Sequence, residues 1–293
     1  MAKDTENQDV VLTQKIADAQ LIVVCDGAGS AKNSVDGANE LASTIHRVLS
    51  STSEDILKDP ANNSKEIKSL VEQAITETRD TILSGKIKQS KDAKKTLTRL
   101  VFPGWLANRF KSRNDDVLSL PIDINDFCST MLVALVCDDK AWFGHIGDGF
   151  IFGLHVTETS KTSTQPIDTE LVSAADTASS ESYAVQSVFS SLPENGEYDT
   201  ETYFFTDDKW QDHFRAGCFN GEFNFVILFS DGAGPFLVER NNADFVGGHA
   251  ISIWKSTKKH VELEVSELLE KFFPEQKVHA VSSDDTSIGL LVR

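Results

Sequence analysis

Residues 21–45 read LIVVCDGAGSAKNSVDGANELASTI, an apolar run that leads through a glycine-rich bend into an amphipathic segment. The apolar run is typical of a buried strand, and it delivers a single carboxylate, that of Asp26, into the bend. Burying an unpaired charge is costly. Asp26 therefore either caps the turn or faces something positive.

Apolar residues recur at helical spacing directly after the bend and again over residues 67–82. We expect the first helix to be capped by Ser34 or Asp36. The second is expected to begin after Asn63, with Glu66 three residues on, and to end before Gly85. Further helical patterns fall within 97–105 and 261–272.

The middle and end of the chain indicate strands. STMLVALVCDD (129–139) and AWFGHIGDGFIFGL (141–154) predict a hairpin that turns near residues 138–140. FNFVILFSDGAG (223–234) and the end of SSDDTSIGLLV (282–292) predict two more strands, and ENGEYDTETYFFT (194–206) predicts a turn and a β-rich run. Residues 156–183 are rich in Ser, Thr, Asp and Glu and predict a mobile surface insertion. Without repeats or a linker, 1–293 is expected to be one domain.

Composition limits the classes of function. The 293 residues carry a net charge of −17, which argues against general nucleic-acid binding. No apolar run approaches the roughly 20 residues of a membrane span, and no secretory signal begins the chain. The four cysteines form no CxxC pair, so we expect reduced core thiols in a cytoplasmic protein and no zinc site.

One segment departs from the acidic average. Between Lys86 and Arg113 there are nine Lys or Arg residues and one acid. This segment is either a solvated helical face or a surface for an acidic or phosphorylated partner.

The bend that follows Cys25 has three counterparts. An apolar run meets a sharp bend with an aspartate in VVCDGAG, GHIGDG and LFSDGAG, and an acid pair, SSDDTS, precedes the last strand. One Asp-Gly pair is usually only a turn. Four acidic bends on strands that share a core can converge, and converged carboxylates repel each other unless cations neutralise them. Oxygen ligands without a His or Cys cluster favour Mg²⁺ or Mn²⁺ over zinc.

The order of these motifs resembles a known family. Asn7-Gln8-Asp9, Asp26-Gly27-Ala28-Gly29-Ser30, Ser129-Thr130 with Gly147-Asp148-Gly149, Ser230-Asp231-Gly232 and Asp284-Asp285-Thr286-Ser287 occur in the order of the PP2C-type metal-dependent protein phosphatases. The DGAGS form resembles a bacterial branch of that family. GEYDTETYFFT resembles a stretch between its third and fourth motifs.

The resemblance implies an α+β fold, a PP2C-like sandwich of two antiparallel sheets flanked by helices. It also implies hydrolysis of phosphoserine and phosphothreonine in proteins by a water that bridges two tightly bound Mn²⁺ or Mg²⁺ ions. Asp26, Asp231 and Asp284 are the implied catalytic residues. Asp26 bridges both ions and the Gly27 carbonyl binds one.

The same resemblance assigns the remaining metal ligands. Asp231 and Asp284 complete the protein ligands of the other ion, and Asp285 is the alternative to Asp284. Asp9 lies in or near the site. Asp148 matches a ligand of a third, weaker ion, or else it merely shapes a turn.

The chain departs from the family pattern at Ala28, Gln8 and Asp4, which stand where many members carry histidine, glutamate and the phosphate-binding arginine. His145 lies near Asp148 in sequence, but core packing is its expected role. The missing arginine favours an alternative: a catalytically weak phosphatase-like module that binds a phosphoprotein or regulates a partner. A sugar hydrolase with paired carboxylates is a further alternative. The expected partner is a phosphorylated protein substrate, with the enzyme opposing a serine/threonine kinase as a monomer.

Overall fold

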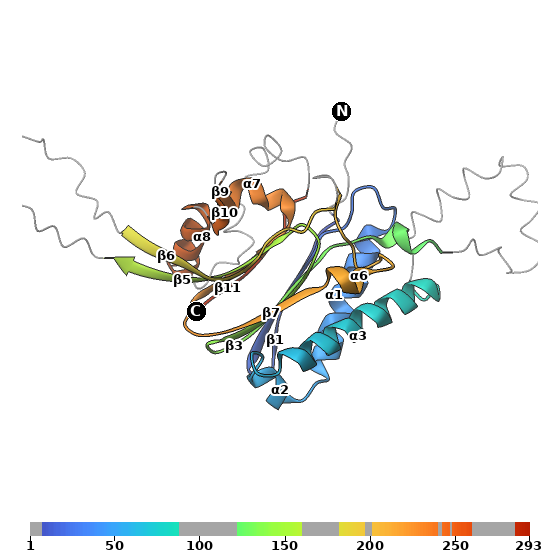
Figure 1. Cartoon of the computed structure of the whole chain (residues 1–293), viewed down its shortest axis with the longest axis horizontal. Coiled ribbons are helices and arrows are strands. Elements are labelled where there is room, and N and C mark those ends of the chain that lie inside the picture. Colours follow the sequence, from blue (N-terminus) through green and yellow to red (C-terminus); the bar gives the residue numbers. More distant parts are fainter. Residues whose placement is uncertain are drawn as a thin grey trace, which may run out of the picture.

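The computed structural model places two antiparallel sheets face to face, with helices on both outer sides (Figure 1). It describes residues 8–87, 122–159, 182–196, 201–239, 242–246, 248–259 and 285–293. The strand order is β1-β2-β3-β4-β7 in the first sheet and β11-β8-β5-β6 in the second. This architecture confirms the α+β sandwich predicted from the sequence.

The elements follow one another in a simple order. The first sheet consists of β1 (Val10–Ile16), β2 (Ala19–Cys25), β3 (Met131–Cys137), β4 (Lys140–Ile146) and β7 (Arg215–Asn220). The second consists of β11 (Ile288–Val292), β8 (Phe225–Phe229), β5 (Phe150–Thr159) and β6 (Ser182–Ser191), and β9 (Val238–Glu239) pairs with β10 (Asn242–Val246). The helices are α1 (Ser34–Ser50), α2 (Glu54–Lys58), α3 (Ser64–Leu83), η1 (Ile124–Phe127), α6 (Trp210–His213), η2 (Asp231–Ala233), α7 (Gly234–Leu237) and α8 (Gly248–Lys259).

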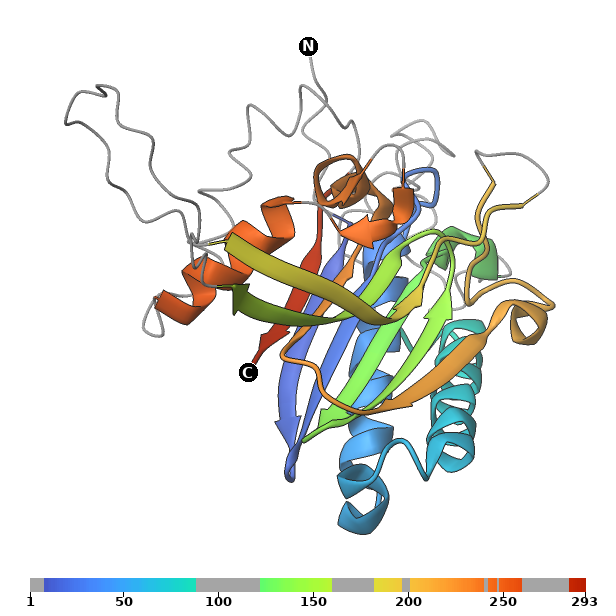
Figure 2. The ribbon, with the colours of Figure 1, turned by 60° about the vertical axis from the view of Figure 1, so that its left-hand side comes forward.

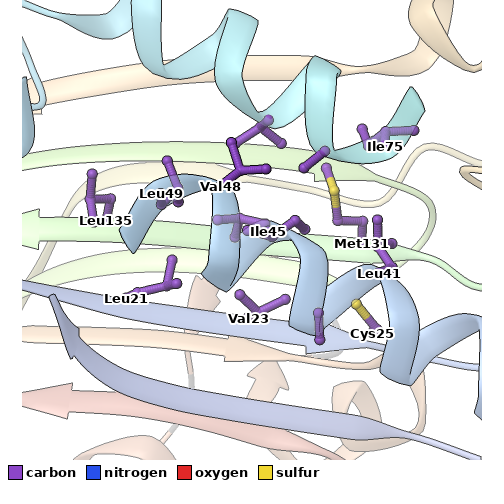
Figure 3. Close-up of a cluster of buried hydrophobic side chains, with 14 of the residues drawn as sticks. Leu21, Val23, Cys25, Leu41, Ile45, Val48, Leu49, Ile75, Met131 and Leu135 are labelled. Carbon is purple, nitrogen blue, oxygen red and sulfur yellow. The ribbon is translucent and has the colours of Figure 1, made fainter. Parts of the chain in front are cut away.

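Strand β2 is buried on both faces because it lies inside the first sheet, between two layers. Leu21, Val23 and Cys25 face α1, where they pack with apolar residues of α1, α3 and β3 (Figure 3). Ile22 and Val24 point the other way, into the core between the two sheets. The uninterrupted apolar run before Asp26 is therefore the pattern of a strand covered on both sides.

The outer layers are held by separate cores. Helices α1 and α3 cover the first sheet, and α7 and α8 cover the second (Figure 1). The loop after β2, the turn between β4 and β5, and the helical turns after β8 come to the same end of the sandwich (Figure 2). None of the helices in the described ranges combines the length and apolar character that crossing a bilayer requires.

Most predicted elements are confirmed, with differences at their ends. Both helices are present as α1 and α3, and the predicted hairpin is β3–β4. The N-cap of α1 is Asn33, which makes no side-chain capping bond, and the expected Ser34 and Asp36 already lie in the first turn of the helix, with the Ser34 hydroxyl donating to the Ala31 carbonyl (3.5 Å). Cys218 is exposed on β7, unlike the three buried cysteines, so the prediction of four core thiols is wrong for this residue.

Residues 204–207 form a turn where the sequence predicts a β-rich run up to residue 206. The Asp207 carboxylate accepts from the Phe204 N–H (2.8 Å), and the Asp207 N–H returns to the Phe204 carbonyl (3.1 Å). Phe205 then enters the core beneath α3. Among the described residues of 194–206, β pairing is limited to a single bridge between Asn195 and Thr202.

Three predictions fall wholly or partly outside the described residues. Strands β5 and β6 occupy the two ends of the predicted insertion 156–183, and 160–181 lie outside the described ranges. The basic segment is described only at residues 86 and 87, and the helical patterns at 97–105 and 261–272 lie outside the described residues. The prediction that 1–293 form one domain stays a prediction.

Candidate active site

Asp26 is fixed by the neighbouring strand at the point where β2 ends. The Thr130 N–H donates to the Asp26 carbonyl (2.8 Å), and the Asp26 N–H donates to the Thr130 hydroxyl (3.2 Å). One residue later the chain makes a bridge between Gly27 and Ser129, and the Ala28 N–H donates to the Cys128 carbonyl (3.0 Å). These bonds fix the backbone of the bend. The direction of the Asp26 side chain is therefore set by the end of β2.

Gly27 is required by close packing. A Cβ atom at this position would lie 2.7 Å from the Gln8 carbonyl oxygen and 3.0 Å from the Ser34 Cβ. Both distances are shorter than ordinary van der Waals contact. Only glycine lets the bend pass between the segment before β1 and the first turn of α1.

Two further carboxyl groups contact that of Asp26. Asp9 precedes β1, whose first residue pairs with Cys25, and Asp231 is the second residue after β8 and begins η2. Burial and the neighbouring Asp9 and Asp231 raise the pKa of Asp26 to about 11, and the Asp26 side chain is hydrogen-bonded to both. Burial also raises the pKa of Asp9. Within the described residues the group is thus a cluster of acids that cannot all ionise at neutral pH without added positive charge.

Ser230 links this cluster to the end of the chain. Its hydroxyl donates to Asp9 Oδ2 (3.2 Å) and accepts from the Ser287 N–H (3.0 Å). Asp285 Oδ2 in turn accepts from the Gln8 N–H (2.7 Å). Segments from both ends of the sequence therefore meet beside Asp26.

A pocket of about 330 Å³ opens over these groups. Its walls include the carboxylates of Asp26, Asp148, Asp231 and Asp285, and none of the described residues that line it is a lysine or an arginine. A second hollow of about 330 Å³ between α3 and α6 has only one carboxylate in its lining, that of Glu72. Of these two pockets, the one at the strand ends is the strongly acidic one.

Asp148 reaches the pocket from the turn between β4 and β5. Gly147 has a φ of +108° and sits so close to Thr130 that a Cβ would lie 2.6 Å from Thr130 Cγ2. The same threonine fixes Asp26. The two turns that carry Asp26 and Asp148 are therefore packed against one common residue.

His145 lies behind this turn rather than in the pocket. It is fully buried, and its Nδ1 lies 2.8 Å from the Ser191 hydroxyl and 3.1 Å from Arg215 Nη2. Burial and the Arg215 charge lower the pKa of His145 well below its ordinary value, so the ring is neutral. The structure agrees with the core role expected for this histidine.

The structure brings together most of the site residues predicted from the sequence. Asp9, Asp26 and Asp231 are in contact, and Gly27 and Asp148 lie on the pocket wall with Asp285. Asp284 lies outside the described residues. Within the described ranges, no group of three or more Asp, Glu, His or Cys side chains is arranged so that it could hold a metal ion.

Two residues that hold the site were not singled out from the sequence. Thr130 and Ser230 belong to the quoted Ser-Thr and Ser-Asp-Gly motifs, but their contacts with the acidic turns join positions about one hundred or more residues apart. The only sequence signal for Thr130 is its place in the Ser129-Thr130 pair directly before an apolar run, and the only one for Ser230 is its place directly before Asp231.

Comparisons with known proteins agree with this architecture. A family model described as "Protein phosphatase 2C" matches residues 1–272. The solved serine/threonine phosphatase of S. agalactiae is 13% identical with a TM-score of 0.55, covering 100% of this chain and 96% of its own. A bacterial serine phosphatase is 12% identical with a TM-score of 0.51, covering 98% of this chain and 92% of its own. A comparison with curated protein sequences found no match.

Proposed function

Because the chain belongs to the protein phosphatase 2C family, whose members are serine/threonine phosphatases, we propose that it removes phosphate from phosphoserine and phosphothreonine in proteins with the help of divalent cations. The observation that carries the proposal is the buried carboxyl cluster of Asp9, Asp26 and Asp231 on an acidic pocket. Such a cluster is stabilised when cations bind it.

The donor atoms of the pocket fit Mn²⁺ or Mg²⁺. They are carboxylate and carbonyl oxygens, which hard divalent cations prefer, and the described lining contains no cysteine or histidine. We propose that Asp26 contacts two tightly bound ions, with the Gly27 carbonyl, Asp231 and Asp284 as further ligands and Asp9 beside them. Asp148 would serve a third, weaker ion.

The ions, when bound, supply positive charge that lowers the pKa of a bridging water and offsets the charge on the phosphoryl oxygens. The protein's own contribution is placement. Thr130 holds Asp26 and packs against Gly147, while Ser230 holds Asp9. Fixed ligands reduce the reorganisation needed as charge develops on the phosphoryl group.

A direct experiment follows phosphate release from phosphoserine and phosphothreonine peptides. Wild type should be active with Mn²⁺, inactive after exhaustive chelation and active again when Mn²⁺ returns. Asp26→Asn should be inactive under all three conditions, and Asp208→Asn, at an exposed aspartate outside the pocket, should match wild type. Hydrolysis that survives chelation would refute metal dependence.

A second candidate function rests on the absence of cationic side chains in the described pocket lining. Without an arginine to hold the phosphate, the chain could act as a catalytically weak module that binds a phosphoprotein or regulates a partner. Under that function a phosphopeptide would bind in the presence of Mn²⁺ with no turnover. Calorimetry with the same peptides distinguishes the two functions.

The proposed setting follows from the function. A phosphoprotein substrate implies a serine/threonine kinase that the enzyme opposes, and we propose a cytoplasmic monomer. Size-exclusion chromatography with light scattering tests the monomer.

A further inference from the structure

Behind the Asp148 turn lies a group of polar and charged side chains that the proposed chemistry does not use. Arg215, at the start of β7, extends toward residues 192–194, which follow β6. Its Nε lies 3.0 Å from Glu194 Oε2, and the two groups face each other as an ion pair rather than as an aligned hydrogen bond. The His213 Nδ1 lies 3.1 Å from the other Glu194 oxygen.

Both members of this ion pair contact the turn that carries Asp148. The Glu194 N–H donates to the Gly147 carbonyl (3.0 Å), and Arg215 Nη2 approaches the same oxygen (3.4 Å). Arg215 Nη1 donates to the Leu192 carbonyl (2.6 Å). Arg215 and Glu194 thus hold the carbonyl of the residue that immediately precedes Asp148.

The same group also supports the part of the pocket wall formed by Thr202 and Phe204. The ring of His213 stacks on that of Tyr203, with centroids 3.4 Å apart and planes 11° apart. The Tyr203 carbonyl oxygen lies near Gly147, at 3.1 Å from the place of a Cβ atom. Its two neighbours, Thr202 and Phe204, line the pocket. This stretch belongs to the GEYDTETYFFT motif.

We propose that Arg215 and Glu194 are positioning residues for the phosphatase reaction: they clamp the Gly147–Asp148 turn to residues 202–204 and so fix Asp148 in the pocket. This inference rests on the proposed function for its kinetic consequence, but the clamp itself is a structural relation. Neither side chain lines the pocket, so their effect on the reaction must be indirect, and the proposed route is through Asp148.

The chain offers a matched control in Arg79. Its Nη1 donates to the carbonyls of Phe205 and Asp207, both at 2.9 Å, and it pairs with Asp208 at 3.9 Å. Arg79 is therefore a second partly buried guanidinium that holds the backbone just beyond Phe204. The described contacts of Arg79 do not reach Gly147.

Amide hydrogen exchange read by mass spectrometry tests the clamp without reference to activity. In Arg215→Met, peptides that cover 145–150 and 202–204 should exchange faster than in wild type. Arg79→Met should speed exchange around 205–208 and leave 145–150 unchanged. Unchanged exchange at 145–150 in a folded Arg215→Met protein would overturn the clamp.

Kinetics then test its role in the reaction. Arg215→Met and Glu194→Gln should each lower kcat/KM about tenfold, the size typical for residues that orient metal ligands. In an Asp148→Ala background, assayed at high enzyme concentration, the same changes should have almost no further effect, because the coupling passes through Asp148. A full tenfold loss in that background would overturn the positioning role.

The outcomes separate the clamp from the proposed function. If wild type shows no metal-dependent hydrolysis, the proposed function fails and the exchange experiment still decides the clamp. If Arg215→Met does not fold, Glu194→Gln takes its place in both experiments, because it keeps the backbone N–H that reaches Gly147. Normal exchange and normal kcat/KM in that variant would then overturn the inference.

Discussion

Replacing Asp26 by asparagine should make the metal-free protein more stable, although it removes the central ligand. The Asp26 carboxyl is buried against Asp9 and Asp231, and these neighbours with burial raise its pKa far above the ordinary 3.8. The folded protein must therefore keep a proton that the unfolded chain releases at neutral pH. Asparagine has a similar size and no charge to neutralise.

The free-energy cost of keeping the proton on Asp26 depends on pH. It depends little on the pKa of Asp26 in the folded protein, provided that this pKa lies well above 7. In the unfolded chain the Asp26 side chain has its ordinary pKa of 3.8, and pH 7 lies about 3 units above this value. At roughly 1.36 kcal/mol per unit, retaining the proton on folding costs about 4 kcal/mol. The amide must also find partners among the acids, so we expect a net gain of roughly 1–3 kcal/mol in the free energy of unfolding.

The direction in which the stability of the metal-free protein changes with pH follows from proton binding. Because the folded pKa is raised, the folded state binds more protons than the unfolded state above about pH 4, and metal-free stability falls as pH rises. Asp26→Asn removes this contribution. Near pH 4 keeping the proton costs almost nothing, so the variant should be less stable than wild type by the cost of placing the amide among the acids; the order should reverse toward neutral pH.

Urea unfolding in chelator at pH 4.5 and pH 7.5 measures the difference. Asp208→Asn serves as the control, because its side chain is fully exposed and lies outside the pocket. Added Mn²⁺ should then stabilise wild type and leave Asp26→Asn unchanged. A variant that is less stable than wild type in chelator at pH 7.5 would refute the reasoning.

Three other predictions concern the site. Asp26→Ala should lose more phosphatase activity than Asp231→Ala, because only Asp26 is proposed to touch both ions; equal residual activity would remove that assignment. Asp148→Ala should lose most turnover while calorimetry still finds two tight Mn²⁺ sites, and wild-type turnover in the folded variant would contradict this. Gly27→Ala should cost roughly 1–3 kcal/mol of stability through its 2.7 Å clash with a backbone carbonyl, whereas Gly29→Ala, with its nearest neighbour at 3.8 Å, should be nearly neutral by denaturant unfolding.

The sequence predicts well where local pattern and burial agree. Helix α1 follows from apolar spacing, and β2 from an unbroken apolar run that the structure covers on both faces. The aspartates at the strand ends also converge as expected. Asp26 follows β2 in the first sheet, Asp231 follows β8 in the second, and the two side chains are in contact. For the helix and the strand, the residues that decide the structure are close in sequence; the aspartates converge because each ends a strand of the same core.

Prediction from the sequence fails where a side chain that is distant in the sequence decides the local structure. Residues 203–206 look like part of a β-rich run, yet Asp207 closes a turn with Phe204, and Arg79, 126 residues away, holds the Phe205 carbonyl. Glu194 looks like a surface turn residue, and its pairing with Arg215 depends on how β7 lies beside β4. No local periodicity encodes these contacts.

The most direct test of the central claim is calorimetric titration of Mn²⁺ into the metal-free protein, with wild type and Asp26→Asn compared at neutral pH. The claim is that the carboxyl cluster beneath the acidic pocket is a divalent-metal centre. We predict two tight sites in wild type, with proton release on binding, and loss of both in Asp26→Asn. Equal binding by the two proteins, or no binding by wild type, would contradict the claim.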